Sequence, residues 1–378
     1  MKSIRVLVVE DSHTIRRYLA DVLRAAPGFE VVGEAADGEQ AIRLCETLRP
    51  DVITMDIVLP GISGVAATEH IMAWNPTPIL IVSASVNRGE ALKTYDALAA
   101  GAVDLVDKPR PGKQRAEWET EFLARVRMVS RIKVITHPRG RLRASFRPPA
   151  KPQPAENAKP RFPPATDVGP GPALAGGSSL PAIRVIAIGA STGGPAAVAE
   201  ILRALPPDFP VPLLIVIHVS EQFAFALAEW LNVQSNLPVR FAIERQALPP
   251  VGQPSVLLAP AGSHLMLEAG QLRLTQTPER HSCRPSVDEL FESVAAYLGP
   301  AAACVLLTGM GRDGAEGLLA ARSAGCLTIA QDEASSIVFG MPGEAIRLNA
   351  AVRILGLDQI GPALATLSVK IPMDGGRF

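Results

Sequence analysis

The stretch IRVIAIGASTGG, residues 183–194, decides the fold of the second half of the chain. Its first six residues are apolar except for Arg184, which predicts a buried strand. The glycine-rich turn GASTGG follows, and a helical pattern begins at about Pro195. A strand that runs through a turn into a helix is typical of an α/β domain with a parallel sheet.

The residues after this stretch continue the alternation. They predict strands at 213–217, at 304–307 and from Cys326, and helices near 223–234, 287–298 and 314–324. Short strands with Pro and Gly turns at 239–275 indicate an antiparallel excursion. The uncharged stretch 293–311 is interrupted by Gly299-Pro300, so we interpret it as a helix end, a turn and a buried strand rather than a membrane span. We therefore expect a doubly wound α/β domain.

The first block of the chain shows the same alternation five times. Repeated strand and helix patterns predict a (βα)5 domain, a doubly wound parallel sheet with helices on both faces. The expected strands are 4–9, 31–32, 52–55, 79–82 and 103–106, and the expected helices are 14–26, 38–48, 64–73, 88–100 and 114–134.

A proline-rich segment separates the two blocks. Residues 138–182 hold 11 of the 34 prolines, with seven Lys or Arg against two Asp or Glu and no apolar period. Such a composition predicts a disordered or polyproline-like linker. We thus expect one domain at 1–137, a linker at 138–182 and a second domain at 183–378. The simpler interpretation of the linker's basic residues is that they keep it solvated. The alternative is that they contact a polyanion or a receptor.

Composition narrows the class of protein. The 37 Lys plus Arg balance the 37 Asp plus Glu, which argues against binding to nucleic acid or to a membrane surface. Four scattered cysteines form no CxxC pair, so a disulfide framework or zinc site is not expected. The N-terminus lacks the pattern of a signal peptide. We expect a cytoplasmic, monomeric protein without direct membrane insertion.

Polar residues end the strands of the first block at one edge of its sheet, where parallel α/β sheets bind ligands. Three carboxylates brought together repel one another, and Mg²⁺ with its oxygen ligands relieves that repulsion. We predict a metal site of Glu10, Asp11 and Asp56, with Asp56 as the phosphoryl acceptor, and phosphoryl binding by Ser83 and Lys108.

The turn at 189–193 matches Gly-x-Ser-x-Gly, a strand–turn–helix pattern that exposes a serine. Of the six histidines, only His218 follows a predicted parallel strand at the edge that carries Ser191. Asp313, which follows strand 304–307, is the expected orienting carboxylate for that base. Asp332 is the second choice, and Asp288 is interpreted as a helix N-terminal acid. The order Ser, His, Asp differs from that of α/β-hydrolases.

Over residues 1–130 the chain resembles the receiver domain of two-component response regulators. The match rests on Glu10-Asp11, Asp56, Leu59-Pro60-Gly61, Ser83 and Lys108-Pro109. The resemblance implies the strand order 2-1-3-4-5, Mg²⁺-dependent phosphorylation by a histidine kinase, and a cis peptide bond before Pro109.

Residues 183–370 resemble the catalytic domain of chemotaxis methylesterases. The matching stretches are 188–194, 284–288, 307–311 with Asp313-Gly314, and 339–342. The resemblance implies Ser191 as nucleophile, His218 as general base and acid, Asp313 as orienter, and an oxyanion site at the backbone near Thr192 and Met310. No cofactor is implied for the ester hydrolysis.

The two resemblances together imply a phosphorylation-activated protein-glutamate methylesterase. It would hydrolyse glutamate γ-methyl esters on methyl-accepting chemotaxis receptors to glutamate and methanol, and as a possible second activity it would deamidate receptor glutamines. The unphosphorylated receiver would cover the catalytic cleft. The alternative is a regulator of the same architecture that serves another signalling pathway or acts mainly by binding proteins. At 219–223 the sequence VSEQF stands where many relatives have a Pro-Pro-Gly turn.

Overall fold

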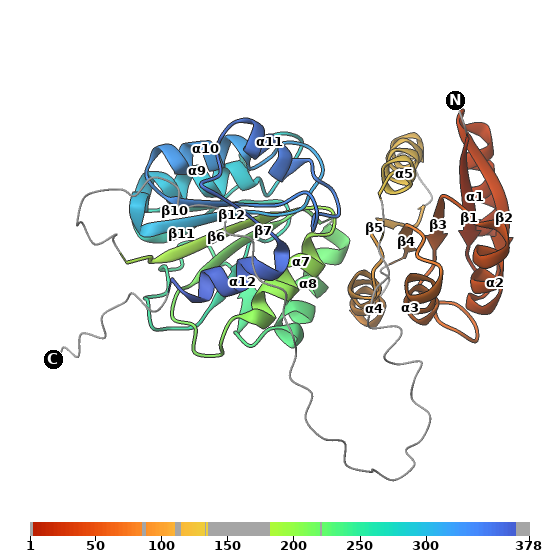
Figure 1. Ribbon diagram of the computed structural model, residues 1–378, viewed down its shortest axis with the longest axis horizontal. Coiled ribbons are helices and arrows are strands. Elements are labelled where there is room, and N and C mark those ends of the chain that lie inside the picture. Colours follow the sequence, from red (N-terminus) through yellow and green to blue (C-terminus); the bar gives the residue numbers. More distant parts are fainter. Residues whose placement is uncertain are drawn as a thin grey trace, which may run out of the picture.

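The computed structural model describes residues 3–84, 88–109, 115–132, 134, 182–219 and 221–367. The predicted linker at 138–182 lies outside these ranges except for its last residue, Ala182. The described residues fold into an N-terminal and a C-terminal domain, each built on its own sheet (Figure 1).

The N-terminal domain is a five-stranded sheet in the predicted order β2-β1-β3-β4-β5, with each neighbouring pair parallel. The short apolar runs of the sequence form these strands because both faces of the sheet are buried. The strands are β1 (Ile4–Val9), β2 (Phe29–Ala35), β3 (Val52–Met55), β4 (Ile79–Ser83) and β5 (Asp104–Asp107).

Helices cover both faces of this sheet. Successive side chains of β1 point to opposite faces, so Val6 and Val8 join one buried cluster and Leu7 and Val9 another. The first cluster packs under α1 (His13–Ala25) and α5 (Arg115–Val129). The second cluster packs under α2 (Gly38–Leu48), α3 (Gly64–Trp74) and α4 (Arg88–Ala99).

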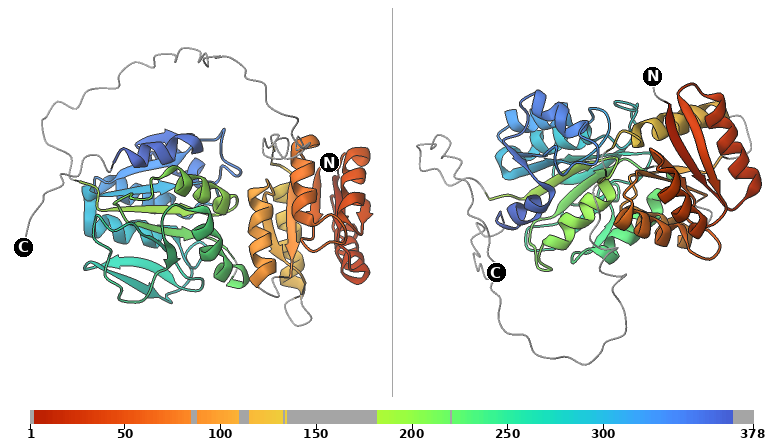
Figure 2. Two further views of the ribbon diagram at one scale, coloured as in Figure 1. Left: turned by 90° about the horizontal axis from the view of Figure 1, so that it is seen from below. Right: turned by 45° about the vertical axis from the view of Figure 1, so that its right-hand side comes forward.

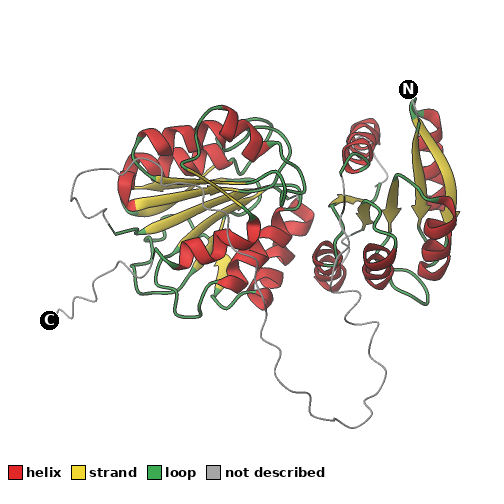
Figure 3. Cartoon of the chain, in the orientation of Figure 1, coloured by secondary structure: helices red, strands yellow, loops and turns green. Residues whose placement is uncertain are grey.

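The C-terminal domain holds a seven-stranded sheet in the order β14-β13-β12-β6-β7-β9-β8. All its neighbouring strands pair in parallel, and helices enclose them from both sides (Figure 3). The strands are β6 (Val185–Ala190), β7 (Leu213–Ile217), β8 (Val239–Phe241), β9 (Val256–Leu258), β12 (Ala302–Leu306), β13 (Leu327–Gln331) and β14 (Arg353–Leu355).

Two helical layers complete this doubly wound fold. Residues Ile186 and Ile188 of β6 face a cluster with α7, α8 and α12, whereas Val185 and Ala187 face a cluster with α9, α10 and α11. The helices are α7 (Gly194–Ala204), α8 (Glu221–Gln234), α9 (Val287–Leu298), α10 (Ala315–Ser323), α11 (Met341–Arg347) and α12 (Leu357–Ala365), with a 3-10 turn η1 (Gly299–Ala301) before β12.

The predicted antiparallel excursion at 239–275 is partly wrong. Strands β8 and β9 join the main sheet in parallel, and only β10 (His264–Glu268) and β11 (Gln271–Thr275) form an antiparallel hairpin. All three residues of β9 are buried, which is the pattern of a strand covered on both faces. The prolines around β9 are typical of surface turns, which is why the sequence alone did not indicate a strand of the main sheet.

The structure also tests the expected cis bond before Pro109, which is wrong, and the interpretation of residues 293–311 as no membrane span, which is confirmed. The bond before Pro109 is not cis; the cis peptide bond among the described residues joins Arg284 and Pro285. Lys108 reaches its carboxylate partners without a cis bond after it. No helix in the described ranges has both the length and the apolar composition needed to cross a bilayer.

Candidate active site and phosphoryl-acceptor site

Ser191 lies in the turn between β6 and α7, at the carboxyl edge of the larger sheet. Its backbone N–H donates to Thr308 O at 3.0 Å, which ties the turn to the loop after β12. A Cβ on Gly309 would stand 2.8 Å from Ser191 Cβ, so this close approach requires glycine. Gly193, with φ of 76°, completes the tight turn.

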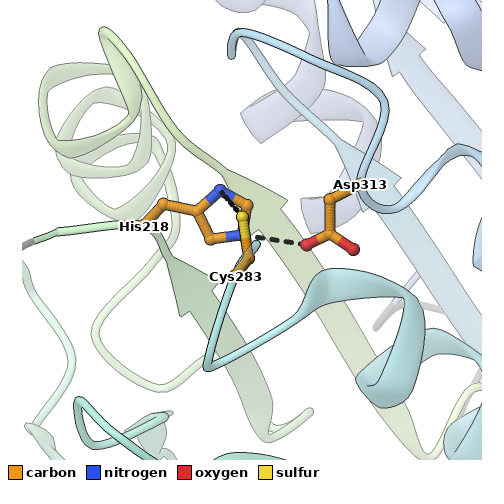
Figure 4. Close-up of side chains that lie close together, drawn as sticks. All are labelled: His218, Cys283 and Asp313. Carbon is orange, nitrogen blue, oxygen red and sulfur yellow. Dashed lines mark hydrogen bonds and ion pairs between the residues drawn. The ribbon is translucent and has the colours of Figure 1, made fainter. Parts of the chain in front are cut away.

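His218 follows β7 on the neighbouring strand, and its backbone N–H donates to Ala190 O at 3.0 Å. The imidazole Nε2 lies 2.9 Å from Asp313 Oδ2, and Nδ1 lies 3.6 Å from Cys283 Sγ (Figure 4). Burial alone would lower the pKa of His218, but its hydrogen bonds with Asp313 and Cys283 outweigh burial and raise the pKa to about 9.

Asp313 is buried beside the first turn of α9. Its Oδ1 accepts from Ser286 Oγ at 2.6 Å, and its Oδ2 accepts from Val287 N at 2.7 Å. Burial would raise the pKa of Asp313, but hydrogen bonds from His218 and Ser286 outweigh it and lower the pKa to about 2. The carboxylate therefore stays ionised and holds the histidine through Nε2.

Two residues behind Asp313 were missed by the sequence argument. Ser286 N donates to Nδ1 of the buried His264, whose Nε2 lies 3.2 Å from Pro278 O. These contacts fix the start of α9, which carries the donors to Asp313. Ser286 directly precedes α9 and is its N-cap residue. Serine is favoured at this position, and this preference is the sequence signal that could have pointed to Ser286.

The other two candidate carboxylates have different partners, although Asp288 lies beside Asp313. Asp332 accepts hydrogen bonds from Ser335 N and Ser335 Oγ in its own turn, at 2.9 and 2.6 Å. Asp288 is in the first turn of α9, as interpreted, and accepts from Gly317 N at 2.6 Å. Neither carboxylate contacts His218 among the hydrogen bonds of the described residues.

A cavity of about 570 Å³ is lined by four of the five residues predicted for the esterase site, all except Asp313. Ser191, Thr192, His218 and Met310 line one side of it, and Thr192 is itself held by Thr308 Oγ1, which donates to its carbonyl at 3.0 Å. The N-terminal domain lines the other side with β5 and α5, through residues such as Leu105, Trp118, Arg125 and Met128. The cleft around Ser191 is therefore covered by the N-terminal domain.

The two domains also meet through α4. Tyr95 of α4 is buried, donates from its hydroxyl to Phe223 O at 3.0 Å, and stacks on Trp230 with ring centroids 5.5 Å apart. Trp230 Nε1 in turn donates to Asp96 Oδ1 at 3.0 Å. Figure 1 and the left view of Figure 2 show α4 beside α7 and α8.

The predicted acidic cluster forms at the carboxyl edge of the smaller sheet. One carboxylate oxygen from each of Glu10, Asp11 and Asp56 lies within 4.8 Å of the others. Lys108 Nζ lies 2.8 Å from carboxylate oxygens of both Glu10 and Asp56. Burial and the charge of Asp56 raise the pKa of Glu10 to about 7, and burial also raises the pKa of Asp56. An all-oxygen, crowded anionic set of this kind fits Mg²⁺.

Ser83 ends β4 beside this cluster and contacts the helix that meets the other domain. Its Oγ accepts from Thr94 Oγ1 of α4 at 3.3 Å. Thr94 is the immediate neighbour of Tyr95. A hydroxyl predicted to bind the phosphoryl group is thus one residue away from the interdomain contact.

Comparison with known proteins identifies the families of both domains. The CheB methylesterase family matches residues 186–364, and the response regulator receiver domain family matches residues 6–116. A protein-glutamate methylesterase/protein-glutamine glutaminase from Anaeromyxobacter dehalogenans is 41% identical over 367 residues, which cover 97% of this chain and 98% of that one. This chain belongs to the CheB methylesterase family.

A second curated relative supports the same assignment, and a solved structure matches the C-terminal part of the chain. A relative of the same description from Nitrosospira multiformis is 41% identical over 368 residues, 96% of this chain and 97% of its own. The crystal structure of the Thermotoga maritima CheB methylesterase catalytic domain covers 49% of this chain and 98% of its own, with 33% identity and a TM-score of 0.47. The N-terminal domain is a response-regulator receiver, and the C-terminal domain is a CheB-type hydrolase domain.

Proposed function

We propose that this chain hydrolyses glutamate γ-methyl esters on chemoreceptors, releasing methanol, and that phosphorylation of Asp56 increases this activity. The observation that carries the proposal is that His218, which lines the same cavity as Ser191, is paired with the ionised Asp313. Relatives that match nearly the whole chain are protein-glutamate methylesterases by name. These relatives do not favour the alternative of a regulator that acts mainly by protein binding.

The proposed chemistry follows from the positions of these groups. His218 takes the proton of the Ser191 hydroxyl while the serine oxygen attacks the ester carbonyl, and backbone N–H groups at Thr192 and Met310 stabilise the oxyanion. The same imidazole then returns the proton to the leaving methoxide, and methanol departs. Water, activated by His218, hydrolyses the acyl-enzyme to glutamate. A receptor glutamine would follow the same steps with ammonia as the leaving group.

Phosphorylation is proposed at Asp56, with a histidine kinase as the donor. Glu10, Asp11 and Asp56 would hold Mg²⁺, which neutralises phosphoryl charge when bound. Lys108 is placed to bind a phosphoryl oxygen because its ammonium already lies against Asp56. Ser83 would bind a second oxygen and so leave Thr94. We propose the division 1–137, 138–182 and 183–378 for the receiver, the linker and the esterase domain.

Asp56→Ala is expected to abolish stimulation by a small phosphodonor such as acetyl phosphate, because it removes the proposed phosphoryl acceptor beside Lys108. The ratio of esterase rates with and without phosphodonor should fall to about one, whereas the exposed Asp21→Ala should keep the wild-type ratio. Methanol release from methylated receptor membranes measures both. Wild-type stimulation of the Asp56 variant would remove Asp56 from the switch.

Tyr95→Ala is expected to raise the unstimulated esterase rate about ten-fold or more. Removing a buried aromatic side chain from the centre of an interface typically costs about 2 kcal/mol or more of interface free energy. Such a loss lowers the ratio of molecules with the receiver over the cleft to molecules without it about thirty-fold. The exposed Trp74→Ala of the same domain is the matched control and should leave the rate unchanged. An unstimulated rate for Tyr95→Ala equal to that of wild type would show that the α4 contact does not restrain the enzyme.

A further inference from the structure

The thiol of Cys283 contacts the proposed general base directly. Cys283 lies in a short loop closed by hydrogen bonds in both directions between its backbone and that of Arg280, at 2.9 and 3.2 Å. Its Sγ stands 3.6 Å from His218 Nδ1 (Figure 4). Cys283 also lines the same cavity as Ser191. The other three cysteines of the chain are buried.

The contact matters because it occupies the ring nitrogen that would have to accept the Ser191 proton. Nε2 faces Asp313 Oδ2 at 2.9 Å, and an ionised carboxylate only accepts hydrogen bonds, so the Nε2 hydrogen points to Asp313. In the neutral imidazole, Nδ1 is then the one ring nitrogen with a lone pair for the Ser191 proton. Among the hydrogen bonds of the described residues, none joins the Ser191 hydroxyl to His218.

We propose that Cys283 is a positioning residue that shares a proton with His218 Nδ1 and so competes with Ser191 for the nitrogen that must act as base. The inference rests on the proposed esterase function of the same site. In the resting molecule, with the receiver over the cleft, His218 is held between Asp313 and Cys283. Reaction requires that Nδ1 leave the sulfur and turn to the serine oxygen. The resting site is therefore held in a geometry that opposes proton transfer from Ser191.

The raised pKa of His218 supports a proton shared between this histidine and Cys283. The raised pKa of His218 comes from its hydrogen bonds with Asp313 and Cys283, which outweigh burial. Other ionisable groups that line the cavity from the esterase loop and from the receiver are Glu279, Arg284, Asp104, Asp107, Glu121 and Arg125. All of these remain when Cys283 alone is changed, so that variant isolates the sulfur.

The first test is an NMR pH titration of the full-length protein with ¹⁵N-labelled histidine, with the His218 signals assigned from a His218→Asn spectrum. A serine at 283 keeps a side chain of similar shape but replaces the thiol that contacts Nδ1. We expect the pKa of His218 in Cys283→Ser to fall by about one unit, because the interaction of the thiol with Nδ1 is lost. Ser282→Ala, an exposed neighbour in the same loop, should titrate like wild type.

An unchanged His218 titration in Cys283→Ser would overturn the proposal. The titration needs no substrate, so its outcome is independent of whether the chain proves to be an esterase. A second readout is the pH profile of kcat/KM for methanol release. Its acid limb should move to lower pH in both Cys283→Ser and Cys283→Ala, whereas a purely structural role would lower the rate without moving the limb.

Discussion

Ser191→Ala is expected to abolish methanol release from methylated receptors, by about 10⁴-fold or more, because removal of the proposed nucleophile leaves only binding and oxyanion contributions. The loss should appear in kcat, since the alanine removes one oxygen at a turn whose backbone is fixed by Thr308 and by the glycines around it. Single-turnover assays with and without phosphodonor measure it.

The receiver provides the control for this variant. Phosphorylation of Asp56 should proceed at the wild-type rate in Ser191→Ala, because the acidic cluster proposed to accept the phosphoryl group belongs to the other sheet. A Ser191→Ala enzyme that releases methanol at even a tenth of the wild-type rate would mean that another group attacks the ester.

Asp313→Asn is expected to lower kcat/KM by about 10³–10⁴-fold. The amide keeps the shape of the side chain but presents a hydrogen-bond donor or a neutral acceptor to His218 Nε2, so it neither fixes the tautomer nor stabilises the imidazolium that forms during proton transfer. It also removes the charge toward which Ser286 and Val287 now donate.

Asp332→Asn is the matched control for Asp313→Asn. Asp332 follows the next strand of the sheet but accepts only from its own turn, so this variant should keep activity within about two-fold of wild type. Equal losses of activity in the two variants would mean that contact with His218 does not decide which carboxylate matters. The assignment of Asp313 as the orienting carboxylate would then fail.

Much of this site follows from strand ends alone. Parallel sheets collect residues at their carboxyl edge, so Ser191, His218 and Asp313 could be grouped from the apolar runs that precede them. The same reasoning grouped Glu10 and Asp56. Strand β9 was misjudged because a three-residue buried run between prolines carries too little pattern to reveal its neighbours.

Contacts between distant loops and between domains could not be predicted in this way. Cys283 reaches His218 through the shape of a loop with positive φ at His281 and Ser282, which no periodicity encodes. The stacking of Tyr95 on Trp230 depends on how two separately folded domains dock. A linker as long as the predicted 45 residues supplies only an effective concentration, so restraint of the enzyme requires such a surface contact.

The most direct test of the account is methanol release from receptor membranes carrying methylated glutamates, measured for the full-length protein with and without a small phosphodonor and Mg²⁺. We predict release above that of membranes alone, and a clear increase on phosphorylation. Release no greater than that of membranes alone, under both conditions, would contradict the proposed function.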